Sequence, residues 1–206
     1  IEKARADSEL QVAREIQKSL LPAVLPPIPG FDVAASSEAC FSVGGDLFDV
    51  IPLADGRFAV ILADVSGKGA PAALFMALSR AFLKATASEG MSAGECLARV
   101  NRLVQAENHA GMFVTMFYGI VNMHTGELEF ANAGHNHPYL VREDEPPAML
   151  NHPNSLVIGL RKQVVYSTHR LQLQPGDCLF LYTDGVTEAM NEADSSCRQL
   201  TTLIPS

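Results

Sequence analysis

The chain has 206 residues, of which 48% are hydrophobic and 18% charged, which suits one globular domain with a short appendage. The formal net charge of −8 argues against non-specific binding to nucleic acid, which requires a basic surface. The four cysteines are widely spaced without a Cys-x-x-Cys pair, which disfavours zinc sites and disulfide frameworks and favours reduced thiols in the cytoplasm.

The apolar stretches and the N-terminus indicate no membrane segment. The longest apolar runs, 57–65 and 112–122, are too short or too interrupted to span a bilayer. The first seven residues carry several charges and have no apolar core, so they do not form a signal peptide. Because the chain does not begin with Met, we expect it to be a fragment of a longer protein.

Residues 2–20 are predicted to form one helix that ends at Pro22 and the proline-rich run 25–30. Apolar residues recur at three- or four-residue spacing on one side of it: Leu10, Ala13, Ile16 and Leu20, with Val12 beside them. Two interpretations stay open. The helix either packs on its own domain, or is a linker that joins an upstream domain or pairs with a second copy.

A strand is predicted over 31–40, followed by a hairpin in which 47–53 and 57–65 flank the turn Ala54-Asp-Gly56. Residues 70–87 form the next predicted helix, with Pro71 in its first turn. Its expected core-facing residues are Leu74, Leu78, Ala81, Phe82 and Ala85.

Another helix is predicted to open at Ser92, which forms a capping-box pattern with Glu95. A series of strands is predicted to follow: 113–121, 128–133, 139–142, 164–173 and 178–183. A hairpin, two helices and then a run of strands indicate an α+β domain in which antiparallel sheets are covered by helices.

Three aspartates lie where predicted strands end beside glycine. They are Asp46 in Val43-Gly-Gly-Asp46, Asp64 in the run 63–69, and Asp184 in Leu181-Tyr-Thr-Asp-Gly185. A strand end supports the carboxylate rigidly, and the glycine allows the backbone or an ion to approach. Carboxylates that converge from several strand ends are what Mg²⁺ or Mn²⁺ requires. These residues are the candidate metal ligands.

Other chemistries fit the motifs less well. Leu62 stands where a phosphate-binding loop of the Walker A type needs its first glycine, and Gly69 follows the lysine where Ser or Thr is required. Ser66 is not in a Gly-x-Ser-x-Gly elbow, which argues against a serine nucleophile. His135 and His137 either lie in a turn whose side chains bond to the backbone, or bind zinc with further ligands from elsewhere.

Taken in order, these segments resemble the PPM/PP2C-like serine phosphatases of the SpoIIE and RsbU type, over residues 9 to about 192. The matching motifs are Ile16-Gln-Lys-Ser-Leu-Leu-Pro22, Val43-Gly-Gly-Asp46, Ala63-Asp-Val-Ser-Gly-Lys-Gly-Ala70, Met112-Phe-Val-Thr-Met-Phe-Tyr118, Ala133-Gly-His135, Pro175-Gly-Asp177 and Leu181-Tyr-Thr-Asp-Gly-Val-Thr-Glu-Ala-Met-Asn191. Each is modest alone, but all of them in this order are specific.

The resemblance implies an antiparallel β-sandwich flanked by helices, with a site for two Mn²⁺ or Mg²⁺ ions at one end. Asp46, Asp64 and Asp184 would bind metal by carboxylate, and Val65 by its carbonyl oxygen. The implied reaction is hydrolysis of a phosphoserine or phosphothreonine by a water that bridges the metals. Ser66 stands where related eukaryotic enzymes place a histidine proposed as an acid, so protonation of the leaving group by metal-bound water is the simpler hypothesis.

Members of this family often follow sensor or receiver domains, as output domains of response regulators, and dephosphorylate anti-sigma-factor antagonists. This favours residues 1–22 as a linker or dimerisation helix and 23–206 as the phosphatase domain, with its C-terminal part incomplete. The resemblance therefore implies a cytoplasmic protein with an upstream sensor, a phosphoserine protein as substrate, and a possible homodimer through the N-terminal helix.

One departure from the family leaves two functional hypotheses. The family usually ends with a strand opened by Asp-Asp-x-Thr, whereas here Arg198 and Gln199 precede 200–204, the candidate last strand. If the aspartate is absent, metal affinity is expected to fall. The first hypothesis is an active phosphatase. The second is a phosphatase-like binding module that recruits a sigma factor or its regulator without catalysis.

Overall fold

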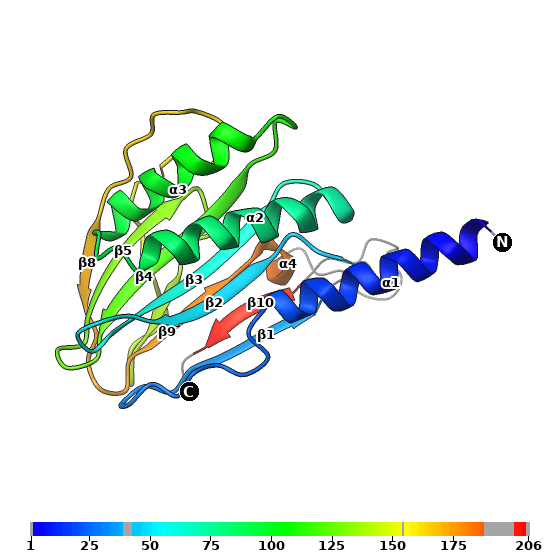
Figure 1. Ribbon diagram of the computed structural model, residues 1–206. Helices are drawn as coiled ribbons and strands as arrows, with labels where there is room; N and C mark the ends of the chain where they lie inside the picture. The colour runs from blue at the N-terminus through cyan, green and yellow to red at the C-terminus, as the bar shows by residue number, and fades with distance from the viewer. Residues whose placement is uncertain (1, 39–42, 154, 188–199, 205–206) are drawn as a thin grey trace.

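The protein, seen here as a computed structural model that describes residues 2–38, 43–153, 155–187 and 200–204, contains two antiparallel sheets (Figure 1). The β3 sheet has the strand order β2 (Leu47–Pro52), β3 (Arg57–Val65), β4 (Val114–Asn122), β5 (Glu127–Ala133) and β8 (His169–Gln172). The β9 sheet has the order β1 (Ala34–Glu38), β10 (Leu200–Ile204), β9 (Cys178–Tyr182), β6 (Tyr139–Val141) and β7 (Ala148–Met149). The helices are α1 (Glu2–Leu20), α2 (Ala70–Ala87), α3 (Ala93–Glu107) and α4 (Asp184–Thr187).

Helices α2 and α3 cover one face of the β3 sheet, and the β9 sheet covers the other, so the predicted α+β sandwich with flanking helices is confirmed (Figure 1). Helix α1 projects from the end of the domain (Figure 1). None of the described helices is long and apolar enough to cross a membrane.

Strand β3 is buried on both faces because it lies between these two layers. Ile61 and Ala63 pack in the core under the helices, whereas Phe58, Val60 and Leu62 pack in the core between the sheets. This alternation follows from the two-residue period of a strand, and it explains the continuous apolar run in the sequence. Full burial of each large apolar side chain contributes about 1.5–3 kcal/mol, so the strand is a stable support for residues at its end.

The predicted β2–β3 hairpin is confirmed, with pairing from Leu47 with Ala63 to Pro52 with Phe58. Its turn contains Asp55 at φ 58° and Gly56 at φ 65°. Two consecutive residues with positive φ suit the right-handed twist of the flanking strands, which fixes the register of the hairpin.

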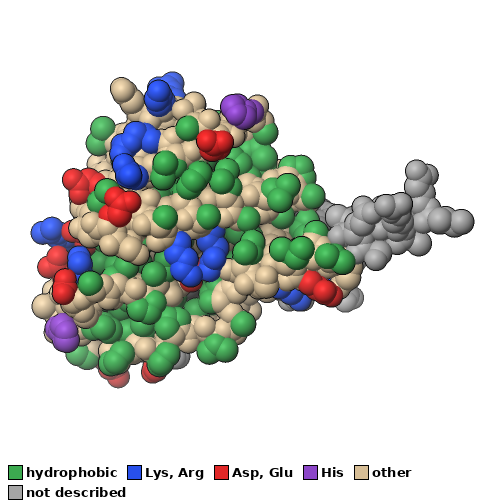
Figure 2. Space-filling model, in the orientation of Figure 1, with side chains coloured by type: hydrophobic (Ala, Val, Ile, Leu, Met, Phe, Trp, Pro, Cys, Tyr) green, Lys and Arg blue, Asp and Glu red, His purple; other side chains and the backbone are tan. Residues whose placement is uncertain are grey.

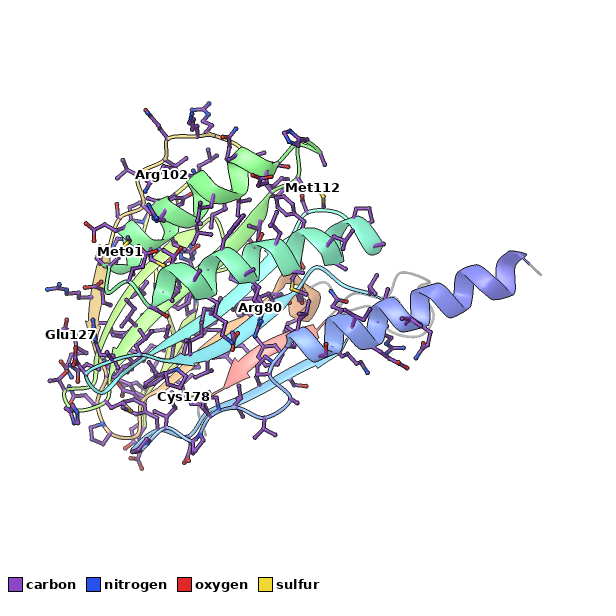
Figure 3. The ribbon with its side chains drawn as sticks, viewed as in Figure 1. Arg80, Met91, Arg102, Met112, Glu127 and Cys178 are labelled. Carbon is purple, nitrogen blue, oxygen red and sulfur yellow. The ribbon has the colours of Figure 1, made fainter. Side chains whose placement is uncertain are left out.

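Helix α2 has the predicted bounds, but of the predicted core-facing residues Leu74, Ala81 and Ala85 are exposed, and Phe82 packs against the core. Leu74 is 73% exposed, whereas Phe75, Met76 and Leu83 are buried against the β3 sheet. Apolar residues lie around most of this helix, so its sequence is compatible with more than one buried face. Arg80, on the edge of the helix, forms an ion pair of 2.7 Å with the buried Asp49 of β2 and helps to set the observed rotation (Figure 3).

The last predicted strands are shorter than expected, and β7 was not predicted. Of the predicted strand 164–173, only the part assigned to β8 pairs with β5. The preceding segment contacts α3 instead, where the Gly94 amide donates a hydrogen bond of 3.0 Å to Thr168 Oγ1 and the Tyr166 carbonyl lies against Gly94. The candidate last strand 200–204 is confirmed as β10, which pairs with β1 and β9.

Three histidines form a row at the side of the sandwich that contains β7 and β8, the edge strands of the two sheets. The ring of His152 lies 4.6 Å from that of His137 and 4.8 Å from that of His169, measured between centroids. Phe130 packs against two of these rings. Both ring nitrogens of His152 are buried without a hydrogen bond of good geometry. Burial lowers the pKa of His152, and the neighbouring His137 and His169 lower it further, whereas the backbone of Pro153 acts in the opposite direction.

We expect this row to make the fold sensitive to mild acid. Below the ordinary histidine pKa of about 6.5, the unfolded chain binds a proton at His152 that the folded chain resists, so stability falls as the pH drops through that value. His152→Phe keeps a ring against Phe130 and removes the titration. Thermal unfolding at about pH 7.5 and about pH 5.5 should therefore give a smaller difference in Tm than in the wild type.

The control for this experiment is His109→Phe, because His109 is an exposed histidine on a loop. It should keep the wild-type difference in Tm between the two pH values. Equal acid sensitivity in His152→Phe and the wild type would contradict the prediction.

Candidate metal centre

Two of the three predicted aspartates come from the β2–β3 hairpin and lie side by side at one end of the β3 sheet. Because Leu47 pairs with Ala63, the next residues outward, Asp46 and Asp64, stand opposite each other. Asp46 is 4% exposed, and Asp64 is half-buried. This is the end of the sheet near which Met112 is labelled in Figure 3.

Gly45 allows the backbone to approach this pair closely. A Cβ atom on Gly45 would lie 2.8 Å from the Val65 carbonyl oxygen, which is closer than Cβ atoms approach other atoms, and 3.2 Å from Asp64 Oδ1, which is a tight contact. A residue other than glycine would therefore displace the backbone, the carboxylate, or both. The glycine brings two predicted oxygen ligands, from Asp64 and Val65, next to the backbone that carries Asp46.

The electrostatics of the pair favour a positive charge between the carboxyls. Burial, the negative charge of Asp46, a hydrogen bond between the two carboxyls and the charge of Asp184 together raise the pKa of Asp64 to about 8, and burial contributes most. The backbone amide of Val65 acts in the opposite direction. Near neutral pH Asp64 thus keeps a proton that lies between two oxygens, and a cation that binds there replaces this proton.

Asp184 approaches from the other sheet. It is the first residue of α4, which follows β9, and its side chain is exposed. The preceding residue, Thr183, is fully buried and donates a hydrogen bond of 2.9 Å from Oγ1 to Asp46 Oδ2. This bond joins the end of β9 to the start of β2, and it therefore fixes the distance between the two sheets where the aspartates lie.

The three predicted aspartates lie near one another, but they are not all in contact. Asp46 and Asp64 are in direct contact, whereas Asp184 acts on Asp64 through its charge. Across the described ranges, no three His, Cys, Asp or Glu side chains are arranged so that they could hold one metal ion. The paired carboxylates and the Val65 carbonyl nevertheless form a donor set that suits Mg²⁺ or Mn²⁺. The expectation about Arg198 and Gln199 lies outside the described residues.

The two histidines of the Ala133-Gly-His135 region point to different partners. His135 is 3% exposed, and its Nδ1 lies 2.8 Å from Thr115 Oγ1, whereas His137 belongs to the histidine row. Asn132 holds the turn, because its Oδ1 accepts from the His135 amide at 2.7 Å and its Nδ2 donates to the His135 carbonyl at 3.0 Å. This agrees with the predicted turn and does not support a shared zinc site.

The hydroxyl of Ser66 completes the backbone pairing beyond the end of β3. The Ser66 amide donates to the Phe113 carbonyl at 2.8 Å, and the Phe113 amide donates to Ser66 Oγ at 2.9 Å. The side chain therefore has a structural partner, consistent with the prediction that it is not a nucleophile.

Helix α1 contacts the loop that carries Asp46. Gln17 Nε2 donates a hydrogen bond of 2.5 Å to the Gly44 carbonyl, and the Gly44 amide donates one of 3.0 Å to Gln17 Oε1. Gly44 is two residues before Asp46, so a movement of α1 would also displace the backbone next to Asp46. Sequence reasoning found the motif that contains Gln17 but not this contact, and it likewise missed the bonds made by Thr183 and His135.

Comparisons with known proteins agree with this architecture. A family model described as Stage II sporulation protein E (SpoIIE) matches residues 54–204. Protein IcfG from Synechocystis sp. is 30% identical over 208 residues, which cover 88% of this chain and 33% of that protein. Phosphoserine phosphatase RsbU from Bacillus subtilis is 30% identical over 185 residues, which cover 90% of this chain and 55% of that protein.

Among solved structures, the SiaA-PP2C domain of Pseudomonas aeruginosa aligns with a TM-score of 0.83 at 19% identity, over 100% of this chain and 98% of that one. The fold is therefore that of PP2C domains. The chain spans from one third to about half of the length of the two curated relatives.

We expect Asp64→Asn to stabilise the metal-free protein in mild alkali. The folded-state pKa of about 8 exceeds the ordinary value of 3.8, so ionisation of Asp64 destabilises the wild type progressively as the pH rises between those values. The amide cannot ionise. In EDTA, the Tm of the variant should exceed that of the wild type at about pH 9 and approach it at about pH 5. Each kcal/mol of destabilisation that the substitution removes should raise Tm by about 2–4 °C.

Asp55→Asn is the matched control, because Asp55 is exposed in a turn with positive φ that asparagine also adopts. It should leave the pH dependence of Tm unchanged. Added Mn²⁺ should raise the Tm of the wild type more than that of Asp64→Asn. An Asp64→Asn variant that is less stable than the wild type at about pH 9 would contradict the prediction that ionised Asp64 destabilises the metal-free fold.

Proposed function

Since the chain belongs to the SpoIIE family and has the PP2C fold, we propose that it is a PPM-type serine phosphatase that acts on a phosphoserine of a signalling protein. The observation that carries this proposal is the contact between Asp46 and Asp64 beside the Val65 carbonyl. A protein has little physical reason to hold two carboxyls together at a strand end unless a cation neutralises them.

The metal ligands in this proposal are the carboxylates of Asp46, Asp64 and Asp184 and the carbonyl oxygen of Val65. Two Mn²⁺ or Mg²⁺ ions supply charge neutralisation for the phosphate and activation of water when they are bound. The chain itself contributes the positions of these donors. Thr183 orients Asp46 through its hydrogen bond, and Gly45 leaves the space that the Val65 carbonyl faces.

Access to the site suits a substrate that is itself a protein. Asp184 is exposed, and Gly67 and Lys68, which follow the metal-binding segment, are exposed as well. A site at the rim of a sheet, open on this side, admits a phosphoserine on a loop of another protein. We include in the proposal an anti-sigma-factor antagonist as the class of substrate, an upstream sensor or receiver domain as the regulator, and the cytoplasm as the location.

The alternative, a phosphatase-like binding module without catalysis, is not favoured by the relatives, of which RsbU is named as a phosphoserine phosphatase. It makes a distinct prediction, because a non-catalytic module binds its phosphorylated partner without releasing phosphate. Activity assays and metal binding therefore separate the two.

The proposal also includes a homodimer formed through α1. Val12 and Ile16 on α1 are 53% and 58% exposed, one helical turn apart on one side of the helix. Leu74 at the start of α2 is 73% exposed. Figure 2 shows hydrophobic side chains on the surface over both helices. A second copy of α1 would cover this apolar side while Gln17, on a different side of the helix, stays bonded to Gly44.

We expect Mn²⁺-dependent hydrolysis of p-nitrophenyl phosphate and of a phosphoserine peptide. Asp64→Asn and Asp184→Asn should each lower kcat/KM on the order of 100-fold or more, since a metal contributes several kcal/mol to stabilisation of the transition state. Asp55→Asn should keep wild-type activity. Hydrolysis is followed by release of nitrophenol and of inorganic phosphate.

Calorimetry with Mn²⁺ completes this test. Binding of Mn²⁺ without phosphate release would support the binding module instead of the enzyme. Absence of Mn²⁺ binding in the wild type would overturn the metal site itself.

We expect Ile16→Asp to convert the dimer to a monomer, because two carboxylates would face each other across the apolar contact. Light scattering during size-exclusion chromatography measures the mass directly. Val165→Asp is the control, because Val165 is 89% exposed on the segment before β8 and far from α1 in sequence. A wild-type monomer at high protein concentration, or a dimer that survives Ile16→Asp, would contradict this interface.

A further inference from the structure

His135 is a buried polar residue that the proposed reaction does not use. It follows β5 of the β3 sheet and precedes β6 of the β9 sheet, so it lies where the chain passes from one sheet to the other. It is 3% exposed, and the two hydrogen bonds from Asn132 hold its backbone in place. Its position is therefore fixed by the turn independently of its ring.

One ring nitrogen of His135 contacts the β3 sheet beside the candidate metal centre. Nδ1 lies 2.8 Å from Oγ1 of Thr115, which pairs with Asp64 in the register of β3 and β4. The one proton of Thr115 Oγ1 can be donated either to the Asp64 carbonyl oxygen, 3.3 Å away, or to His135 Nδ1, 2.8 Å away, and the shorter contact favours the ring. The imidazole is thus one side chain away from the backbone of a predicted metal ligand.

The ring also faces the β9 sheet. The backbone carbonyl of Tyr182 interacts with His135, although Nε2 is buried without a hydrogen bond of good geometry. Tyr182 ends β9, and the next two residues are Thr183, which bonds to Asp46, and Asp184. A small shift that brought the carbonyl into line with Nε2–H would move the segment that carries Asp184.

We propose that His135 is a positioning residue that ties Thr115 in one sheet to the Tyr182 carbonyl in the other, and so sets the distance from Asp184 to the Asp46–Asp64 pair. The inference rests on the proposed metal-dependent function. A neutral imidazole suits this role because it accepts at Nδ1 and donates at Nε2 at the same time, from opposite sides of a rigid ring.

The proposal explains two features of the site together. Asp184 acts on Asp64 through its charge, yet it does not complete a three-residue ligand set in the described part of the chain. The contact between His135 and the Tyr182 carbonyl of the same segment lacks good hydrogen-bond geometry at Nε2. Formation of the His135–Tyr182 hydrogen bond accompanies metal binding in this interpretation, because both require the same movement at the end of β9.

The test measures Mn²⁺ affinity by calorimetry and Tm in EDTA for the wild type, His135→Leu, His135→Gln, Thr115→Val and the double variant His135→Leu/Thr115→Val. Supporting groups of metal ligands typically change affinity about 10–100-fold, and we expect His135→Leu and Thr115→Val to weaken Mn²⁺ binding by that amount. The double variant should bind no more weakly than His135→Leu, since both changes break one link. His135→Gln, with an acceptor and a donor, should recover part of the affinity.

A second readout uses the metal-free protein. Nitrogen-15 chemical shifts of His135 should report the tautomer with the proton on Nε2 in the wild type, and a mixture of tautomers in Thr115→Val. Thr115→Val keeps the branched shape of the side chain and removes the hydroxyl that contacts His135, so it remains informative if His135→Leu does not fold. His109→Leu, a change in an exposed loop histidine, should alter neither Mn²⁺ affinity nor Tm.

The remaining outcomes show whether His135 positions the metal ligands or has only a structural role. If the folded variants have a lower Tm but bind Mn²⁺ as tightly as the wild type, His135 is only structural and the inference is overturned. A proton on Nδ1 in the wild type also overturns it. If the wild type hydrolyses phosphoserine while all variants bind Mn²⁺ equally, the inference fails alone. If the wild type binds no Mn²⁺, the proposed function fails and the inference fails with it.

Discussion

Two carboxyl groups that repel each other when ionised, those of Asp46 and Asp64, are held side by side by the β2–β3 hairpin. The register from Leu47 with Ala63 to Pro52 with Phe58 imposes this contact, and burial of β3 on both faces makes the register costly to change. Burial, together with the neighbouring carboxyls of Asp46 and Asp184, raises the pKa of Asp64 to about 8, so the ionised pair is unfavourable unless a cation neutralises it. The hydrophobic layers thus stabilise a local charge arrangement that is unfavourable by itself.

The second constraint is the distance between the sheets. The apolar core between them keeps the sheets packed along their length, but it cannot fix the positions of polar groups at the end, where the core stops. Hydrogen bonds supply that precision. Thr183 joins the end of β9 to Asp46, and Thr115 with His135 joins the start of β4 to the turn after β5. Asp184 directly follows Thr183 in the chain, so the Thr183 bond also holds the backbone that carries Asp184.

Local signals predicted most of the elements but not their contacts. The helices α1 and α2 and the hairpin follow from proline, glycine and apolar spacing, whereas the rotation of α2, which leaves Leu74 exposed, depends on a tertiary choice between several apolar faces. Glycine beside aspartate at strand ends predicted the Asp46–Asp64 contact. The bond from Thr183 to Asp46 joins residues 137 apart in sequence, and His135 meets Thr115 across 20, so no local pattern could reveal either.

Helix α1 connects the proposed dimer to the candidate metal centre by its geometry. Adjacent residues of a helix point about 100° apart, so Ile16 and Gln17 lie on different sides. Gln17 bonds to the Gly44 backbone near Asp46, while Ile16 is 58% exposed and is available to a second copy. A rigid helix that turns or shifts when it pairs must move both side chains together. In the proposed dimer, a rearrangement of α1 would therefore displace the loop that carries Asp46 through the hydrogen bonds between Gln17 and Gly44.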